Sequence, residues 1–190
     1  MTYVIDVLRQ EHRIIEKMLR VLERELSVFD RGAHPNYEAI LGVIEYFKDY
    51  PDSCHHPKED VIFEKLKSRS PSAAAKIGDL HQEHKDEANR LRRVSQAIDQ
   101  VLSDQDLVRR NVAEIIREFI DHERQHMEKE ERIFFPAALK VLRPKDWADI
   151  ALKLADRRDP LYEPGLAQKF SLLRGKILEI EAEAEAERLD

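Results

Sequence analysis

The amino-acid sequence predicts an all-α protein: an up-down-up-down four-helix bundle followed by two additional C-terminal helices. Two observations lead to this fold class. The 190 residues include only 5 glycines and 37% are charged, which is typical of helical proteins with solvated outer faces. Apolar residues also recur at alternating spacings of three and four, as on one face of a helix. Four long stretches of this kind, joined by short turns, favour a bundle.

The first two helices are expected over residues 3–30 and 37–67, with Asn36 as the N-cap of the second. The inner stripe of the first helix comprises Leu8, His12, Ile15, Leu19, Leu22, Leu26 and Phe29. The stripe of the second comprises Ile40, Ile44, Phe47, Pro51, His55, Glu59, Ile62 and Leu66. Pro51 and Pro57 each remove a backbone hydrogen bond, so we expect a kink near them.

The third and fourth helices are expected over residues 71–102 and 103–142, with Ser70 and Pro71 at the start of the third. The third stripe comprises Ile77, His81, His84, Ala88, Leu91, Ser95, Ile98 and Leu102. The fourth comprises Val112, Ile115, Phe119, His122, His126, Glu130, Ile133 and Ala137. Pro136 is expected to bend the last turns of the fourth helix.

The remaining chain predicts two shorter helices, over residues 143–156 and 166–188, joined by a turn-rich connector. We therefore expect the bundle to occupy residues 1–142 and a C-terminal extension to occupy residues 143–190. The last helix carries an apolar stripe of its own. It packs either on the bundle or on a second subunit, and the second case would make a homodimer.

Composition excludes several classes of function. The net charge is −6 and acids are mixed with bases, which gives no footprint for nucleic-acid binding. No apolar run approaches the roughly 18 residues that span a membrane, and no signal peptide is visible, so we expect a cytoplasmic protein. The single cysteine, Cys54, excludes an internal disulfide and a cysteine-based zinc site.

Ionisable residues interrupt all four apolar stripes. A buried ionisable group without a partner costs several kcal/mol or changes its charge state, so these groups need a shared partner. Two of the helices place a histidine and a glutamate four residues apart, which puts both on one face. The residues concerned are His12, His55, Glu59, His81, His84, His126 and Glu130.

A metal centre in the bundle core is the simplest shared partner. Imidazole and carboxylate ligands without thiolate suit iron, manganese or zinc. Seven ligands exceed what one transition-metal ion holds, and they fit two ions bridged by the glutamates with a position left open. Each feature alone has an ordinary explanation, as a core histidine or a helical i,i+4 pair. Their occurrence on four different helices favours the metal site.

Two further histidines lie near these positions in the sequence. His56 is about 100° around the helix from His55, although the kink at Pro57 can turn it inward. His122 lies one turn before His126 on the same stripe. Each is a metal ligand, a hydrogen-bonding partner of a ligand, or a core imidazole, and the sequence leaves these alternatives open.

Taken together, these motifs resemble the hemerythrin-like family, specifically its HHE cation-binding branch. The resemblance covers residues 3–142 and is carried by Glu11-His12, by residues 54–63, by Glu83-His84 and by residues 126–136. It implies a four-helix bundle around a non-haem, oxo- or hydroxo-bridged di-iron centre. By this resemblance the terminal ligands are His12, His55, His84 and His126, and the bridging ligands are Glu59 and Glu130.

The chain departs from the oxygen-carrier members at two points. Those members have His-x-x-x-His on the third helix, where this chain has His81-x-x-His84. They have His-x-x-x-x-Asp on the fourth helix, where this chain has Glu130 and Glu131 four and five residues after His126. Ligation by His81 and the choice between the two glutamates therefore stay open. Glu130 is preferred because i+4 places it on the face of His126.

The resemblance implies two iron ions, with zinc or manganese as alternatives in the isolated protein. The expected function is binding of O₂ or a related diatomic such as NO, or of peroxide, in sensing, storage or stress response, rather than catalysis. One alternative is a di-iron oxidase or a peroxide-consuming enzyme. Ferritin-like oxidases use two Glu-x-x-His motifs, and this chain has one, whose Glu123 is expected off the inner stripe. A metal-responsive regulatory binding protein is another alternative.

Overall fold

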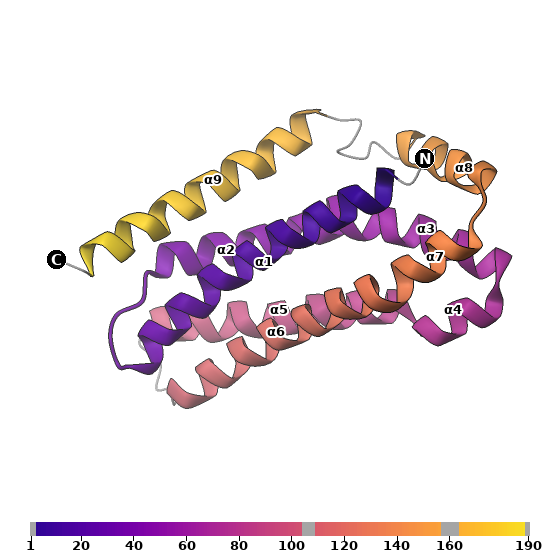
Figure 1. The fold of residues 1–190 in the computed structure, drawn as a ribbon. Coiled ribbons are helices and arrows are strands. Elements are labelled where there is room, and N and C mark those ends of the chain that lie inside the picture. Colours follow the sequence, from indigo (N-terminus) through magenta and orange to yellow (C-terminus); the bar gives the residue numbers. More distant parts are fainter. Residues whose placement is uncertain (1–2, 104–108, 157–163, 189–190) are drawn as a thin grey trace.

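The computed structural model describes residues 3–103, 109–156 and 164–188, and it contains helices without strands over these ranges (Figure 1). The all-helical fold class is therefore confirmed. The elements are α1 (Tyr3–Asp30), α2 (Tyr37–Tyr50), η1 (Pro51–His55), α3 (His56–Arg69), α4 (Pro71–Ile77), α5 (Leu80–Leu102), α6 (Arg109–Lys129), η2 (Glu130–Phe134), α7 (Phe135–Val141), α8 (Pro144–Asp156) and α9 (Pro164–Glu187).

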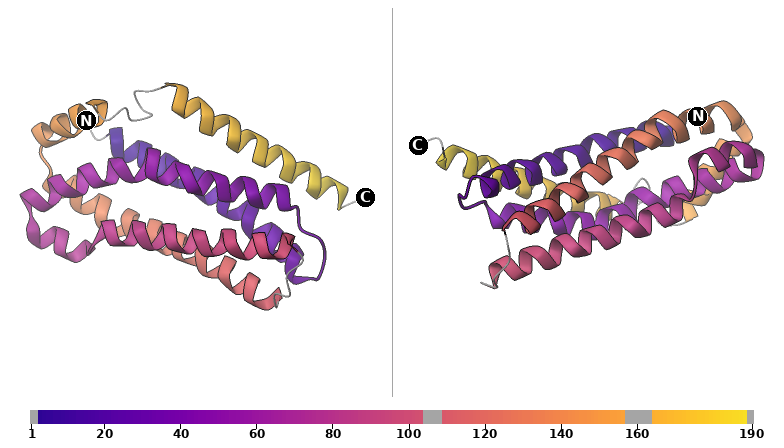
Figure 2. Two further views of the ribbon diagram at one scale, coloured as in Figure 1. Left: turned by 180° about the vertical axis from the view of Figure 1, so that it is seen from behind. Right: turned by 90° about the horizontal axis from the view of Figure 1, so that it is seen from below.

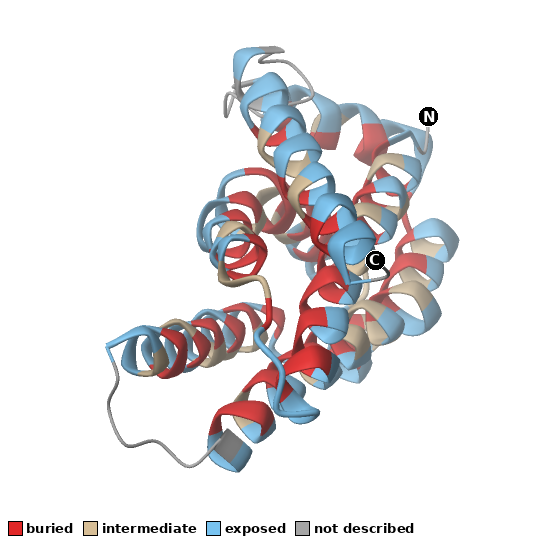
Figure 3. Ribbon diagram, turned by 90° about the vertical axis from the view of Figure 1, so that its left-hand side faces the viewer, coloured by how far each residue is buried: buried red, intermediate tan, exposed pale blue. Residues whose placement is uncertain are grey.

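Four long helical segments run side by side along the molecule (Figures 1 and 2). They are α1, the continuous run α2–η1–α3, α5, and the continuous run α6–η2–α7. Helix α1 packs against α2 and α6, while α5 packs against α6 and α2, which closes the bundle. The buried residues line the facing sides of these helices (Figure 3).

The apolar core is divided into two clusters by a layer of ionisable side chains. The large core cluster contains α1 from Ile15 onward together with α2, the later part of α5, α6 and α9. The end core cluster contains the start of α1 together with α3, α4, α7 and α8. Between them every segment of the bundle carries buried polar residues. These are Glu11, His12, His55, His56, Lys58, Glu59, His84, Glu87, Glu123, His126 and Glu130.

The second and fourth segments each contain one π-helical turn at this layer. The turn η1 closes with the His56 N–H donating to the Pro51 carbonyl, and η2 with the Phe135 N–H donating to the Glu130 carbonyl. A proline follows each closing residue, at Pro57 and Pro136. Proline has no N–H for the bond to the carbonyl four residues earlier, so the helix widens by one residue. The expected kinks take the form of these turns.

The third predicted helix is not continuous, and this expectation was wrong. Gly78, with φ +93°, ends α4, and the side chain of Asp79 then caps α5 by accepting from the Gln82 N–H. Only glycine adopts this backbone conformation readily. Because α5 starts afresh at Leu80, its inner stripe contains Glu87, which is buried, where Ala88 was expected.

The fourth predicted helix differs at its start. Ser103 is the C-cap of α5, residues 104–108 lie outside the described part of the chain, and α6 is described from Arg109. The connector over residues 157–163 also lies outside the described residues.

The two C-terminal helices cover different parts of the bundle. Helix α8 packs on α3, where Trp147 is buried. Helix α9 packs on α2 through Phe170 and Ile177. A Cβ atom at Gly42 would lie 2.8 Å from the Ile177 side chain, so this contact needs a glycine on α2. Phe170 and Ile177 of the apolar stripe of α9 are thus buried within their own chain, while Leu173 and Ile180 are half-buried. No helix among the described residues is long and apolar enough to cross a membrane.

Candidate metal centre

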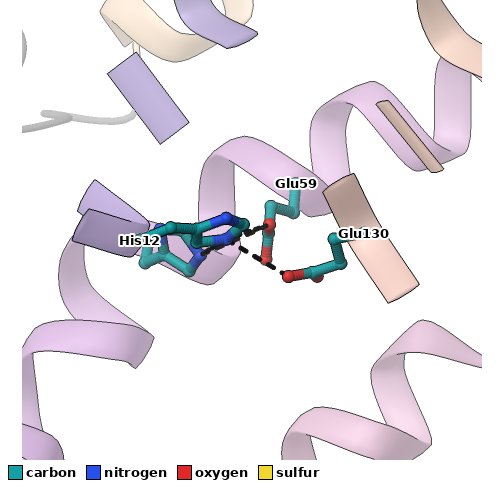
Figure 4. Close-up of side chains that lie close together, drawn as sticks. His12, Glu59 and Glu130 are labelled. Atoms are coloured by element: carbon teal, nitrogen blue, oxygen red, sulfur yellow. Dashed lines mark hydrogen bonds and ion pairs between the residues drawn. The ribbon is translucent and has the colours of Figure 1, made fainter. Parts of the chain in front are cut away.

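The layer between the two core clusters brings six of the predicted ligands together. They come from all four segments of the bundle, and each is no more than 7% exposed. Figure 4 shows His12 facing the carboxylates of Glu59 and Glu130. The six residues are His12, His55, Glu59, His84, His126 and Glu130.

These side chains form two groups that share both glutamates. One group comprises His12, His55, Glu59 and Glu130, and the other comprises Glu59, His84, His126 and Glu130. Within each group the potential ligand atoms all lie within 4.8 Å of one another. Each group can hold a metal ion, and two ions held in this way would have two carboxylates in common.

The carboxylate of Glu59 presents one oxygen to each group. Its Oε1 lies 3.3 Å from His55 Nε2 and 3.9 Å from His12 Nε2. Its Oε2 lies 3.6 Å from His84 Nε2. The carboxylate thus spans the gap between the histidines of α1 and η1 and the histidine of α5.

The carboxylate of Glu130 divides its oxygens in the same way. Its Oε2 lies 3.3 Å from His12 Nε2, and its Oε1 lies 3.1 Å from His126 Nε2. A carboxylate that faces two sets of imidazoles through different oxygens would be placed to bind two metal ions at once.

Several atoms at the centre of this cluster are buried without a hydrogen-bond partner. They include both oxygens of Glu59, both oxygens of Glu130, and the Nε2 atoms of His84 and His126. Buried polar atoms are almost always hydrogen-bonded, because an unpaired one costs about 1–3 kcal/mol. Cations coordinated at the centre would satisfy these lone pairs together. The residues present therefore fit a metal centre.

Carboxylates outside the cluster lie within hydrogen-bond distance of the outward nitrogens of His12, His55 and His126, whereas Asp60 lies farther from that of His84. An Nδ1–H that donates to a carboxylate leaves Nε2 with a lone pair for a metal. The Nδ1-to-oxygen distances are 3.1 Å for His12 and Glu131, 2.9 Å for His55 and Glu11, 3.2 Å for His126 and Glu83, and 3.7 Å for His84 and Asp60. Three of these carboxylates are in turn paired with cations, namely Arg9 with Glu131, Lys58 with Glu11 and Lys129 with Glu83.

In the metal-free protein, protons take the place of the cations. Burial alone would lower the pKa of His12, but Glu130 and Glu131 outweigh it and raise this pKa to about 9. Burial alone would raise the pKa of Glu59, but the neighbouring histidines, His55 first, hold it well below its usual range. Metal ions would have to displace these protons, so metal affinity falls as the pH falls.

His56 is buried beside the cluster but faces other partners. Its Nδ1 lies 3.1 Å from Asp52 and its Nε2 lies 3.3 Å from Glu87. Its ring stacks on that of His84, with the ring centroids 3.7 Å apart. Burial opposes a charge on this ring, but the two carboxylates raise its pKa to about 10. His56 thus links two carboxylates as a charged imidazole.

The other open candidates also lie outside the two groups. The side chain of His81 is 48% exposed and pairs with Asp60 and Glu64. His122 is half-buried with an unpartnered Nε2, and burial lowers its pKa. Glu131 contacts His12 from outside the cluster, while Glu130 contacts it from inside.

Sequence reasoning missed four buried charged residues, namely Glu11, Lys58, Glu87 and Glu123. The expectation that Glu123 lies off the inner face was wrong, since it is 6% exposed. Burial, and next the charge of Glu87, raise the pKa of Glu123 well above its usual range. Glu87 and Glu123 each lie three residues from an inward histidine. Spacing of i±3 shares a helix face as i±4 does, and this signal could have found them.

A cavity of about 280 Å³ leads from the surface between α2 and α5 toward one side of the cluster. Its lining includes Lys48, Gln96 and Ala88 together with apolar Phe47, Leu91 and Phe119. Its lining also includes His56, His84, Glu87 and Glu123. A small molecule in this cavity would therefore lie next to the group that contains His84.

Comparison with known proteins agrees with this geometry. No match to the chain was found among curated proteins or among solved structures. The family model of the hemerythrin HHE cation binding domain matches residues 3–138, which include every residue of the two ligand groups. Since the match covers most of the chain, the resemblance is confirmed, and the protein belongs to the hemerythrin HHE cation-binding family.

Proposed function

We propose that this protein holds two iron ions and binds O₂ or a related small ligand, such as NO or peroxide, in a sensing, storage or stress-response role. One observation carries the proposal. Glu59 and Glu130 each turn one oxygen toward each of two histidine groups, which is the arrangement that two bridged ions require. The bridging role of these glutamates and the terminal role of His12, His55, His84 and His126 are part of the proposal.

Iron is proposed over other metals on two grounds. Imidazole and carboxylate ligands accept iron, manganese or zinc, and zinc is excluded because it cannot supply the two electrons that O₂ binding needs. Iron is proposed over manganese because the resemblance to the family implies a di-iron centre. The chain shields the ligands from most of the solvent, because they are buried and the ring of Phe135 stacks on that of His12 with the ring centroids 5.4 Å apart. Exclusion of water protects a reduced centre from side reactions.

Metal content tests the first half of the proposal. Protein produced with iron and purified without chelator should contain two iron ions per chain and show a charge-transfer band in the near ultraviolet. Zinc alone, or a single ion per chain, would overturn the di-iron assignment.

Mixing of the reduced protein with O₂ tests the second half. A band that appears with O₂ and disappears under vacuum or argon supports reversible binding. Irreversible oxidation in a single exposure contradicts it.

The cavity beside His84 is proposed as the route of the small ligand. Ala88 is exposed and lines this cavity, so Ala88→Phe should narrow it without replacing a ligand. We expect slower association of O₂ or NO in stopped-flow measurements, with the iron content unchanged. Unchanged association rates would exclude this route.

Peroxide consumption is a second candidate, and Glu123 favours it. This residue lines the cavity, and its raised pKa favours the uncharged acid, which can donate a proton to a small oxygen ligand. Many turnovers of peroxide per chain, lost in Glu123→Gln at unchanged iron content, would establish this function. Fewer than one turnover per chain would exclude it.

A further inference from the structure

The carboxylate of Glu87 lies between a proposed metal ligand and His56. Glu87 follows His84 by three residues on α5 and is 5% exposed. Its Oε1 lies 3.0 Å from His126 Nε2, and its Oε2 lies 3.3 Å from His56 Nε2. The hydrogen bond from His56 accounts for Oε2, whereas Oε1 is buried without a hydrogen-bond partner.

The contact between Glu87 Oε1 and His126 Nε2 needs a positive charge, either a proton on His126 or a metal ion. His126 Nδ1 lies 3.2 Å from Glu83, and an Nδ1–H that donates there leaves Nε2 with a lone pair. Two lone pairs 3.0 Å apart repel each other in a buried site unless a positive charge lies between them.

The distance itself is that of neighbouring ligands on one ion. Nitrogen and oxygen ligands bind transition metals at about 2.1 Å, so two ligands at a right angle are about 3.0 Å apart. Glu130 Oε1 lies at 3.1 Å from the same His126 Nε2. Glu87 and Glu130 therefore approach His126 at nearly equal distances, from two different helical segments.

We propose that Glu87 is a further metal ligand, specific to the ion held by His84 and His126. This inference rests on the two-metal function proposed above. It makes the centre asymmetric, because Glu87 would add a third carboxylate on the side of His84 and His126, whereas both groups otherwise have only Glu59 and Glu130. The additional anion strengthens binding at the His84 side and leaves more open coordination at the His12 side.

Three variants separate ligation from simple ion pairing. Glu87→Gln keeps the shape of the side chain but removes its charge. His56→Gln removes the partner of Glu87 and leaves its carboxylate in place. Glu123→Gln is the matched control, since Glu123 is an equally buried carboxylate in the same cavity without a contact of this kind to His126 Nε2. Each protein is loaded with ⁵⁷Fe without oxygen and examined by Mössbauer spectroscopy and by the rate of iron loss to a chelator.

If Glu87 is a ligand, Glu87→Gln loses one of its two iron ions at least about tenfold faster than the wild type. Only one of the two quadrupole doublets changes in this variant. His56→Gln and Glu123→Gln keep both ions at rates near those of the wild type.

Other results overturn the inference. Wild-type behaviour of Glu87→Gln shows that Glu87 is no ligand, and equal losses in Glu87→Gln and His56→Gln show that it acts only through His56. In both cases the two-metal proposal stands. A wild-type protein that holds a single ion overturns both proposals together.

A structure of the metal-loaded wild type decides the matter should Glu87→Gln fail to fold. An ion within about 2.2 Å of Glu87 Oε1 supports ligation. An ion that binds His84 and His126 but lies beyond about 3 Å from Glu87 contradicts it.

Discussion

Three of the four inward histidines have a carboxylate within hydrogen-bond distance of the outer ring nitrogen. The Nε2 atom points to the centre of the cluster, and the Nδ1 atom faces a carboxylate. Three of these carboxylates, those of Glu131, Glu11 and Glu83, form ion pairs with an arginine or a lysine. Such outer partners fix the orientation of a ligand and raise its basicity, and their removal typically costs about 10–100-fold in metal affinity. We therefore expect these ion pairs to contribute more to metal affinity than to the stability of the fold.

Glu130 and Glu131 are adjacent in sequence but have different expected roles. Glu130→Gln should lose both bound ions, because the carboxylate that faces both histidine groups disappears. Glu131→Gln should keep two ions with an affinity lowered by about 10–100-fold, because only the Nδ1 partner of His12 is lost. Metal analysis and chelator competition measure both effects. The reverse order would assign the bridge to Glu131.

The raised pKa of His12 predicts how pH affects the metal-free protein. The folded-state pKa of about 9 lies above the value of about 6.5 of an unfolded chain. Protonation thus stabilises the fold fully below pH 6.5, and this contribution, on the order of 3 kcal/mol, is lost as the pH rises through 9. Urea unfolding of the chelator-treated protein should show lower stability at pH 9 than at pH 6.5.

Two comparisons check this pH dependence. In His12→Gln the loss between pH 6.5 and pH 9 should be smaller, because the group that titrates is gone. The metal-loaded protein should show the opposite trend, since deprotonated ligands bind metal more tightly. Equal stability of the metal-free wild type at the two pH values would contradict the prediction.

The sequence predicts inward positions well where the helical period is unbroken. His12 and His126 lie on regular stripes of α1 and α6, and their burial follows from the spacing alone. The expected inward positions of His81 and Ala88 assume one continuous helix over residues 71–102. Gly78 interrupts this helix, and both residues are exposed. The burial of Glu87 and Glu123 depends on partners from other helices, such as His56 and His126, which a single-helix pattern does not contain.

At the scale of the helix, the π turns set the direction of the ligands. One extra residue in a helix rotates the later turns by about 100° relative to the earlier turns. His55 ends η1 and Glu130 begins η2, so a ligand lies on the boundary of each π turn. The prolines predict an irregular turn at these positions. That the turn is π-helical depends on the backbone N–H before each proline donating to the carbonyl five residues earlier.

Replacement of a proline tests this role of the π turn. In Pro57→Ala the new N–H can donate to the carbonyl of Ser53, which allows an α-helical turn in place of η1. We expect iron affinity to fall by about tenfold or more, while the metal-free protein keeps or gains stability. Pro71→Ala is the control, because a proline at the first helical position replaces no hydrogen bond. Unchanged iron affinity in Pro57→Ala would show that the turn does not depend on this proline.

At the scale of the molecule, the metal centre joins two apolar cores. We propose residues 1–142 as the bundle and residues 143–190 as an extension that covers both, with α8 on the end core cluster and α9 on the large core cluster. The last helix buries Phe170 and Ile177 of its stripe on α2, and a homodimer through the C-terminal helices remains a prediction. Packing of one helix on another depends on both surfaces. The sequence of α9 alone therefore does not decide whether the helix packs on its own bundle or on a second subunit.

Metal removal should therefore weaken the whole fold at its middle layer. Each ion at a thousandfold excess over its dissociation constant adds about 4 kcal/mol to stability, so two ions add about 8 kcal/mol, which corresponds to about 20 °C in the melting temperature of a chain this size. Calorimetry before and after treatment with a chelator measures this shift, and magnesium, which prefers oxygen ligands, should not restore it.

Hydrogen exchange should slow most at η1 and η2 when iron binds, because both turns carry ligands and connect the two core clusters. An equal melting temperature with and without iron would mean that the two clusters are held together by the apolar contacts and ion pairs of the protein alone.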